Sequence, residues 1–236
     1  TYLVRLAIVR HEGLDAAGYY QAAFAISGSL PGFVFAAMGA DFFPRVAAAN
    51  DEEEARQTTE KQIKAGLLLG APLIMALLTL GKLSIRLLYA NGFDAAIPLL
   101  AWMTWGVFLR LITWPLGFWL LARGSTRQVV WLEAVGAVVA TLLPVLLLPR
   151  FGLVSASVAF AIAAVAYGVA IGLVFRLKSG GWFGRELHVW VIIAVAALAA
   201  GQRWASAQDG DYAGFVPVVF IGALCAWRYR QEMRTR

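Results

Sequence analysis

Long apolar segments alternate with short polar linkers along nearly the whole chain. An apolar stub at residues 2–9 comes first, and seven apolar segments follow it. We place these segments at 18–40, 66–89, 97–122, 129–149, 153–175, 187–203 and 213–228. A helix needs about 20 apolar residues to cross a hydrocarbon core of roughly 30 Å. The pattern therefore predicts membrane-spanning helices, with the last two segments near the lower length limit.

The composition supports membrane-spanning segments and indicates that they are helices. The chain of 236 residues is 61% hydrophobic and 14% charged, and its mean hydropathy is +0.71. A soluble domain carries about 25% charged residues. The apolar runs are continuous and do not alternate with period two, which indicates helices. The predicted fold class is an all-α integral membrane protein.

The stretch 95–122 holds a single charge, Arg110, about halfway along. An arginine at the middle of a membrane helix costs roughly 2.5–3.5 kcal/mol on insertion scales, so it faces a partner or a watery cavity. Helical spacing places it on a small and polar face. This face consists of Gly106, Arg110, Thr113 and Gly117. We expect Arg110 and Thr113 to line a cavity.

Two prolines predict irregular helices. Pro115 removes the hydrogen bond to the carbonyl of Leu111, which predicts a kink one turn past Arg110. In the first segment, residues 28–32 include Pro31 and predict a break in the middle of the helix. Two interpretations of this break stay open: a packing kink between small residues, or a flexible helix that lines a pathway.

The linker 41–65 is the one long polar stretch, and it predicts a polar cytoplasmic helix at about 50–65. Asn50 is a good N-cap, and acidic residues occupy the first turn. The pairs Glu52–Arg56 and Glu60–Lys64 have the favourable i, i+4 orientation. The helix is either a solvated connector or a segment that lies near the lipid headgroups.

Three further charged residues either line the cavity or have an ordinary role at the membrane surface or at a helix interface. Lys82 and Arg86 lie one turn apart near the end of their segment. They either extend to lipid headgroups or hold a phosphate or pyrophosphate group. Glu133 lies about one turn inside its segment. It is an interface residue, or else a cavity carboxylate that binds a cation or pairs with an arginine.

The distribution of basic residues predicts the orientation in the membrane. Alternate linkers and the tail carry thirteen lysines and arginines on one side, and the opposite side carries five. Basic residues are retained in the cytoplasm. The thirteen-residue side, with the C-terminus, is therefore predicted to be cytoplasmic. This pattern also explains the net charge of +6 without nucleic acid as a partner.

The sequence lacks the signatures of several kinds of chemistry. Cys225 is the only cysteine, and the two histidines, His11 and His188, stand apart, so we expect neither a disulfide within the chain nor a metal site. No phosphate-binding glycine loop and no Ser/His/Asp grouping appears. We therefore predict transport without a cofactor, and no enzyme activity. The opening stub resembles the end of an apolar helix, from which we expect a C-terminal portion of a longer protein.

Several short motifs together resemble a known family of transporters. In the first segment and the linker after it they are Gly18-Tyr19-Tyr20-Gln21-Ala22-Ala23, Ile26-Ser27 and Phe42-Phe43-Pro44-Arg45. Further on they are Leu87-Leu88-Tyr89-Ala90-Asn91-Gly92-Phe93, Ala95-Ala96, Leu99-Leu100, Glu133 and Gly152-Leu153-Val154-Ser155-Ala156-Ser157. In this order the motifs are similar to the second half of polysaccharide flippases in the multidrug/oligosaccharidyl-lipid/polysaccharide exporter superfamily. The resemblance covers roughly residues 5–175.

This resemblance implies a fold of two six-helix bundles that face each other across a central cavity. The chain would be the second bundle plus two extra C-terminal helices. Residues 1–17 would end a truncated helix, residues 18–177 would form the bundle, and residues 178–236 would add two spans and a basic tail. Arginines in the cavity suit an anionic substrate, so we expect Arg110 to be a substrate ligand and Arg5 a second such charge. The alternative for Arg110 is a structural salt bridge to an acid on another helix, Glu133 or one in the missing half.

The implied function is the movement of undecaprenyl-pyrophosphate-linked oligosaccharides, such as O-antigen precursors, across the bacterial inner membrane by alternating access. The implied partners are this substrate, membrane lipid, the missing N-terminal half and the polysaccharide polymerase machinery. Two alternatives remain. One is a drug or peptidoglycan-precursor exporter of the same fold, and the other is a non-transporting scaffold in a polysaccharide-synthesis complex.

Overall fold

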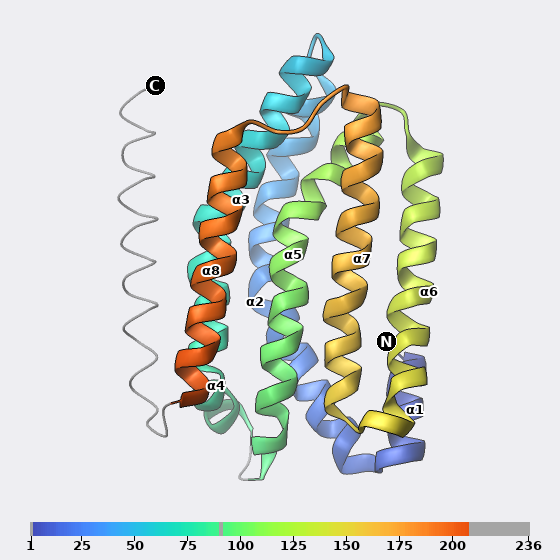
Figure 1. Ribbon diagram of the computed structural model, residues 1–236, viewed down its shortest axis with the longest axis vertical. Coiled ribbons are helices and arrows are strands. Elements are labelled where there is room, and N and C mark those ends of the chain that lie inside the picture. The colour runs from blue at the N-terminus through green and yellow to red at the C-terminus, as the bar shows by residue number, and fades with distance from the viewer. Residues whose placement is uncertain (1, 90–91, 208–236) are drawn as a thin grey trace.

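The structure, a computed structural model, describes residues 2–89 and 92–207 as a bundle of helices (Figure 1). These residues contain no strand, which confirms the predicted all-α class. In chain order the elements are α1 (Tyr2–Glu12), α2 (Leu14–Ala47), α3 (Glu52–Thr79), α4 (Gly81–Leu88), η1 (Phe93–Ala95), α5 (Ala96–Ala122), α6 (Thr126–Phe151), α7 (Val154–Ser179) and α8 (Arg185–Ala207).

The described residues include five helices that are long and apolar enough to cross a membrane. They are Glu52–Thr79, Phe93–Ala122, Thr126–Phe151, Val154–Ser179 and Arg185–Arg203. The last four correspond to the predicted segments 97–122, 129–149, 153–175 and 187–203, Glu52–Thr79 covers only the first part of the predicted segment 66–89, and α2 covers the predicted segment 18–40. The predicted segment 213–228 lies outside the described residues. The integral membrane class predicted from the apolar pattern is thus confirmed.

Helix α5 is the centre of the bundle and packs against α2, α3 and α7. Glycines allow the close approach. A Cβ atom on Gly70 of α3 would lie 2.6 Å from Leu111 Cδ1 of α5, and one on Gly106 of α5 would overlap the ring of Phe160 of α7. Because apolar side chains gain little from leaving lipid, close backbone packing of this kind is what holds membrane helices together.

Residues 28–32 do not interrupt the helix, because α2 continues from Leu14 to Ala47, and the two interpretations of this region, a packing kink and a helix that lines a pathway, stay predictions. Pro31 removes only one backbone donor, and the remaining helical hydrogen bonds have no substitute in lipid. Two serine hydroxyls also bond back into the helix. Ser27 Oγ donates to Phe24 O at 3.1 Å, and Ser29 Oγ donates to Ala25 O at 2.6 Å.

The bend expected at Pro115 is compatible with α5. The helix keeps Pro115 in its interior without a break, and Figure 1 shows its ribbon bending toward its C-terminal end. A proline that removes one hydrogen bond and crowds the preceding turn bends a helix in this way.

The polar helix predicted at about 50–65 is the first part of α3, which runs on into the membrane-spanning part without a break. Its N-cap is Asp51, one residue after the predicted Asn50. The Asp51 carboxylate accepts the backbone N–H of Glu54 at 2.7 Å. Asn50 instead donates its backbone N–H to Glu54 Oε2 at 2.8 Å. The two contacts together satisfy free donors at the helix start.

The predicted single span at 66–89 is divided in the structure, since α3 ends at Thr79 and the short α4 begins at Gly81. A Cβ atom on Gly81 would lie 3.3 Å from Leu100 Cδ2, so the glycine lets the chain pack closely against α5 where it changes direction. Helix α4 lies at the foot of the bundle in Figure 1, at the end opposite the α5–α6 connection.

One predicted ion pair of α3 is confirmed and the other is wrong. Lys64 Nζ lies 3.2 Å from Glu60 Oε1, as predicted. Arg56 pairs with Glu53 at 2.7 Å and not with Glu52. Glu52 instead lies 3.5 Å from the guanidinium of Arg123, which comes from the α5–α6 connection. A partner from a distant part of the chain thus replaces the local one.

Polar contacts join α3 to the start of α8, and we call this set, formed by Glu60, Lys64, Gly184 and Glu186, the polar clasp. Lys64 Nζ lies 2.9 Å from Glu186 Oε2, and Glu60 Oε2 accepts the backbone N–H of Gly184 at 3.0 Å. The polar clasp lies at the end of the bundle that holds the α2–α3, α5–α6 and α7–α8 connections (Figure 1). It fixes α8 to α3 outside the apolar part of the bundle.

We predict that this end of the bundle is cytoplasmic, because the linkers that meet there carry the excess of basic residues. Exposed residues at this end, Ala48, Thr126 and Lys178, and exposed Leu14 at the opposite end can each be replaced by cysteine in a Cys225→Ser background. An impermeant thiol reagent should label only Leu14→Cys in intact cells. Labelling of Thr126→Cys or Lys178→Cys from outside would reverse the orientation.

The polar clasp should contribute to stability through Lys64, whose side chain is 16% exposed and neutralises Glu60, which is 15% exposed. We expect Lys64→Ala to lower the free energy of unfolding by about 1–3 kcal/mol, because a shielded carboxylate loses its cation. Thermal unfolding of the purified protein in detergent measures this. The matched control is Lys61→Ala at an exposed site, which should change little. Equal effects of the two variants would contradict the assignment.

Candidate functional site

An open groove of about 390 Å³ lies between α5, α6 and α7. It exists because α7 packs closely against both of the other helices, whereas α5 and α6 make few contacts with each other. Small residues on all three helices keep its walls low. They are Gly106, Gly117, Gly136, Ala137, Ala140, Ala163 and Ala164. The groove is thus a gap between α5 and α6 with α7 at its base. It can hold a ligand that enters from the open side.

Arg110 lies in this groove together with the other three residues of the predicted face, Gly106, Thr113 and Gly117. The sequence spacing therefore located one wall of the groove correctly. Arg110 is exposed, and it makes no hydrogen bond or ion pair with any residue that the structure describes. Its guanidinium group, with five donors, is available to an anion that enters the groove.

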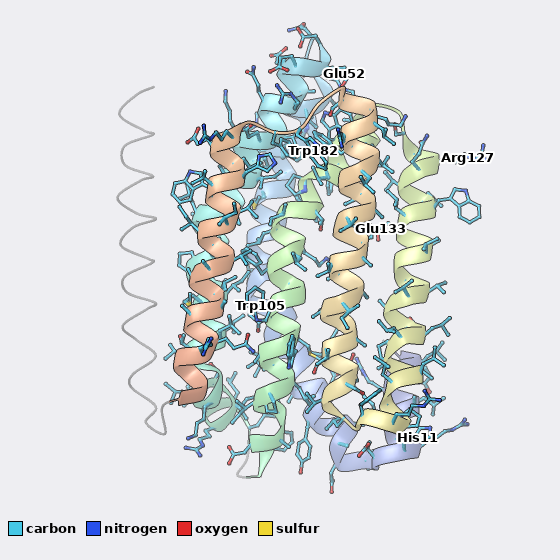
Figure 2. The ribbon with its side chains drawn as sticks, viewed as in Figure 1. His11, Glu52, Trp105, Arg127, Glu133 and Trp182 are labelled. Atoms are coloured by element: carbon cyan, nitrogen blue, oxygen red, sulfur yellow. The ribbon has the colours of Figure 1, made fainter. Side chains whose placement is uncertain are left out.

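Glu133 lines the same groove from α6, and Figure 2 shows it between α6 and α7. The hydroxyl of Tyr167 on α7 donates a hydrogen bond to Glu133 Oε1 at 2.7 Å. Within the described part of the chain, Glu133 forms no ion pair, so the predicted pairing with an arginine is not made here. Glu133 thus lines the groove, and the remaining interpretations, an interface residue or a carboxylate that binds a cation, stay predictions.

The two charges lie at different depths. At a rise of 1.5 Å per residue, Arg110 is about 18 Å from the end of α5, and Glu133 is about 10 Å from the start of α6. The two helix ends are joined by the short α5–α6 connection. Counted along the two helices, Arg110 thus lies about 8 Å further than Glu133 from the α5–α6 connection.

Sequence reasoning missed Tyr167 and the residues that position it. A Cβ atom on Gly136 of α6 would lie 3.0 Å from Tyr167 Cδ2, so the missing side chain makes room for the phenol ring. The sequence did hold one signal. Tyr167 is the only tyrosine in the small-residue segment 153–175, where its hydroxyl needs a polar partner.

The other predicted site residues lie elsewhere. Arg5 is on α1, which packs against α2 and α6, and its Nε atom is buried without a hydrogen-bond partner among the described residues. Lys82 and Arg86 are on α4 at the opposite end of the bundle, where Arg86 Nε lies 3.4 Å from Asp94 Oδ1. The structure thus brings Arg110, Thr113 and Glu133 together and leaves Arg5, Lys82 and Arg86 outside the groove.

The residues that the structure describes contain no group of three or more His, Cys, Asp or Glu side chains that could hold a metal ion. The groove offers instead a guanidinium, a carboxylate and a phenol among apolar and small side chains. Such a set can bind and orient a charged ligand by hydrogen bonds and charge.

The described residues include five helices of membrane-spanning length, three of which form a charged groove, and these features define a multi-pass membrane protein. The family model described as "Lipid II flippase MurJ" matches residues 15–209, and the chain belongs to this family of lipid-linked precursor flippases. The match extends from α2 through α8. Comparisons with curated proteins and with solved structures gave no match.

The width of the groove should depend on Gly106. A Cβ atom at this position would overlap the half-buried ring of Phe160, which also lines the groove. We expect Gly106→Ala to lower the free energy of unfolding by about 1–3 kcal/mol through overpacking. Thermal unfolding in detergent measures the loss. Gly18→Ala, where nothing lies within 4 Å of the added carbon, is the control and should be close to neutral. A neutral Gly106→Ala would show that α5 and α7 separate easily.

Proposed function

We propose that the protein is a lipid II flippase of the bacterial inner membrane, a transporter and not an enzyme. Its substrate would be the peptidoglycan precursor, an undecaprenyl-pyrophosphate-linked disaccharide that carries a peptide. The match to the family model over residues 15–209 is the observation that carries this proposal. Movement would follow alternating access, in which the substrate site opens to one side of the membrane at a time.

The groove supports the proposal through the chemistry of Arg110. A guanidinium group binds phosphate oxygens through two parallel hydrogen bonds, and a pyrophosphate offers such oxygens. Arg110 lies in a membrane helix without a protein partner among the described residues, which is a costly arrangement unless a ligand or water meets it. The low walls at Gly106 and Gly117 leave that side accessible.

The lipid-linked oligosaccharide predicted from the sequence is the second candidate substrate. It carries the same pyrophosphate, so Arg110 would serve either substrate equally well. The motifs in residues 5–175 favour it, and the family match favours lipid II. A drug exporter is less well supported, because an arginine in the groove would repel a cationic drug. A non-transporting scaffold would leave Arg110 without a ligand.

The rest of the transporter also belongs to the proposal. We expect a second six-helix bundle, encoded upstream, to face the groove and to complete the cavity. Other partners would be membrane lipid and, for an oligosaccharide substrate, the polymerase machinery that receives it. The C-terminus would lie in the cytoplasm, as the basic linkers predict.

Replacing Arg110 should abolish transport without preventing folding. In cells that depend on the full-length protein for lipid II transport, we expect Arg110→Ala to stop growth while membrane levels of the protein stay near normal. Arg110→Lys should support partial growth, because it keeps the charge but loses the planar fork. Growth rate and immunoblots of the membrane fraction measure the two effects.

The matched control is Arg127→Ala. Arg127 is an exposed arginine on α6 that extends away from the bundle in Figure 2 and does not line the groove, so its loss should leave growth unchanged. Normal growth with Arg110→Ala would mean that Arg110 is not a substrate ligand. Degradation of the Arg110→Ala protein would instead indicate a structural ion pair with the upstream half.

A further inference from the structure

We propose that Glu133 and Tyr167 form a subsite for a primary ammonium group of the substrate, beside the anion subsite at Arg110. This inference rests on the proposed function, and it deepens it by naming the part of the substrate that the protein selects. The peptide of a peptidoglycan precursor can carry such an amine on its side chain. A lipid-linked oligosaccharide without amino groups cannot.

The first step is the unsatisfied carboxylate. An ionised carboxylate accepts about four hydrogen bonds. Among the described residues Glu133 receives one, from the hydroxyl of Tyr167 to Oε1, and no cation lies within ion-pair distance. A carboxylate within a membrane segment is costly unless it faces a cavity or a cation. The groove supplies the cavity, and a cationic ligand would supply the charge.

The second step is the fit of an ammonium group to this pair. Tyr167 uses its proton on Glu133, which leaves the lone pairs of the phenol oxygen free to accept. An ammonium group donates three hydrogen bonds. Glu133 Oε2 and the Tyr167 oxygen can accept two of them, and water in the open groove can accept the third. Gly136 leaves room for the Tyr167 ring and adds no side chain to the groove.

The third step is the relation between the two charges. Arg110 lines the same groove but forms no ion pair with Glu133, although each would neutralise the other. Because both charges line one groove, one ligand can contact both when a flexible segment, such as the peptide, joins its anion to its ammonium group. A single substrate can then satisfy both side chains, whereas a pyrophosphate alone satisfies only Arg110.

The experiment compares two substrates on the full-length protein in proteoliposomes. Both are undecaprenyl-pyrophosphate-linked disaccharides with a lysine-containing pentapeptide, and in one of them the lysine side chain is acetylated. We expect the wild-type protein to prefer the free amine. Glu133→Gln should reduce transport of the free-amine substrate about tenfold, as for one lost charge-assisted contact, and leave the acetylated substrate unchanged.

Two further variants separate recognition from folding. Tyr167→Phe keeps the ring but loses the hydroxyl, so it should lower the preference for the free amine partially. Glu12→Gln makes the same chemical change on an exposed residue of α1 outside the groove and should leave the preference intact. Comparable thermal unfolding of all variants in detergent would show that they fold.

The outcomes are distinguishable. If Glu133→Gln reduces transport of both substrates equally, the ammonium subsite is overturned. If this reduction also changes when sodium is replaced by potassium, Glu133 binds an inorganic cation. No effect of Glu133→Gln would overturn the ammonium subsite as well. A wild-type protein that moves both substrates equally refutes only this subsite. A wild-type protein that moves neither substrate refutes the proposed function itself.

Discussion

The close packing of α5 between α3 and α7 is the constraint on which the remaining structure depends. Gly70 of α3 and Gly106 of α5 bring the helices so near that an added Cβ would overlap Leu111 of α5 and Phe160 of α7. Such contact supplies the attraction that the hydrophobic effect cannot supply between helices in lipid. Together with α2, helices α3 and α7 cover much of α5, and Arg110 lines the groove on the side that faces α6.

That space exists because α6 is held by α7 and α1, and only weakly by α5. The bundle thus combines a tight half, built on α5, with a looser wall formed by α6. Polar side chains follow the same division. Arg110 and Thr113 come from the tight half, whereas Glu133 comes from the wall and is oriented by Tyr167 of the helix between them. A ligand that touches both charges would span the least tightly packed boundary of the bundle.

The sequence predicted the features that depend on one helix at a time. The apolar segments, the face around Arg110 and the pair Glu60–Lys64 all follow from spacing along a single helix, and all agree with the structure. Features that join distant segments could not be predicted. The contacts of Glu133 with Tyr167 and of Glu52 with Arg123 depend on how helices are placed side by side, which spacing does not encode. The continuity of α2 through residues 28–32 was missed because lipid enforces backbone hydrogen bonding more strongly than proline opposes it.

The bundle is held together by two kinds of contact that depend on different solvents, and the polar clasp is one of them. The contacts between α5 and its neighbours are apolar, and their strength depends on the surrounding lipid or detergent. The joint between α3 and α8 ends in charged groups near water, where the Debye length falls from about 10 Å at 0.1 M salt to about 3 Å at 1 M. Ionic strength therefore acts on the polar clasp and not on the apolar contacts of α5, and it acts most directly at Glu186, whose side chain is 54% exposed, whereas Lys64 is largely shielded.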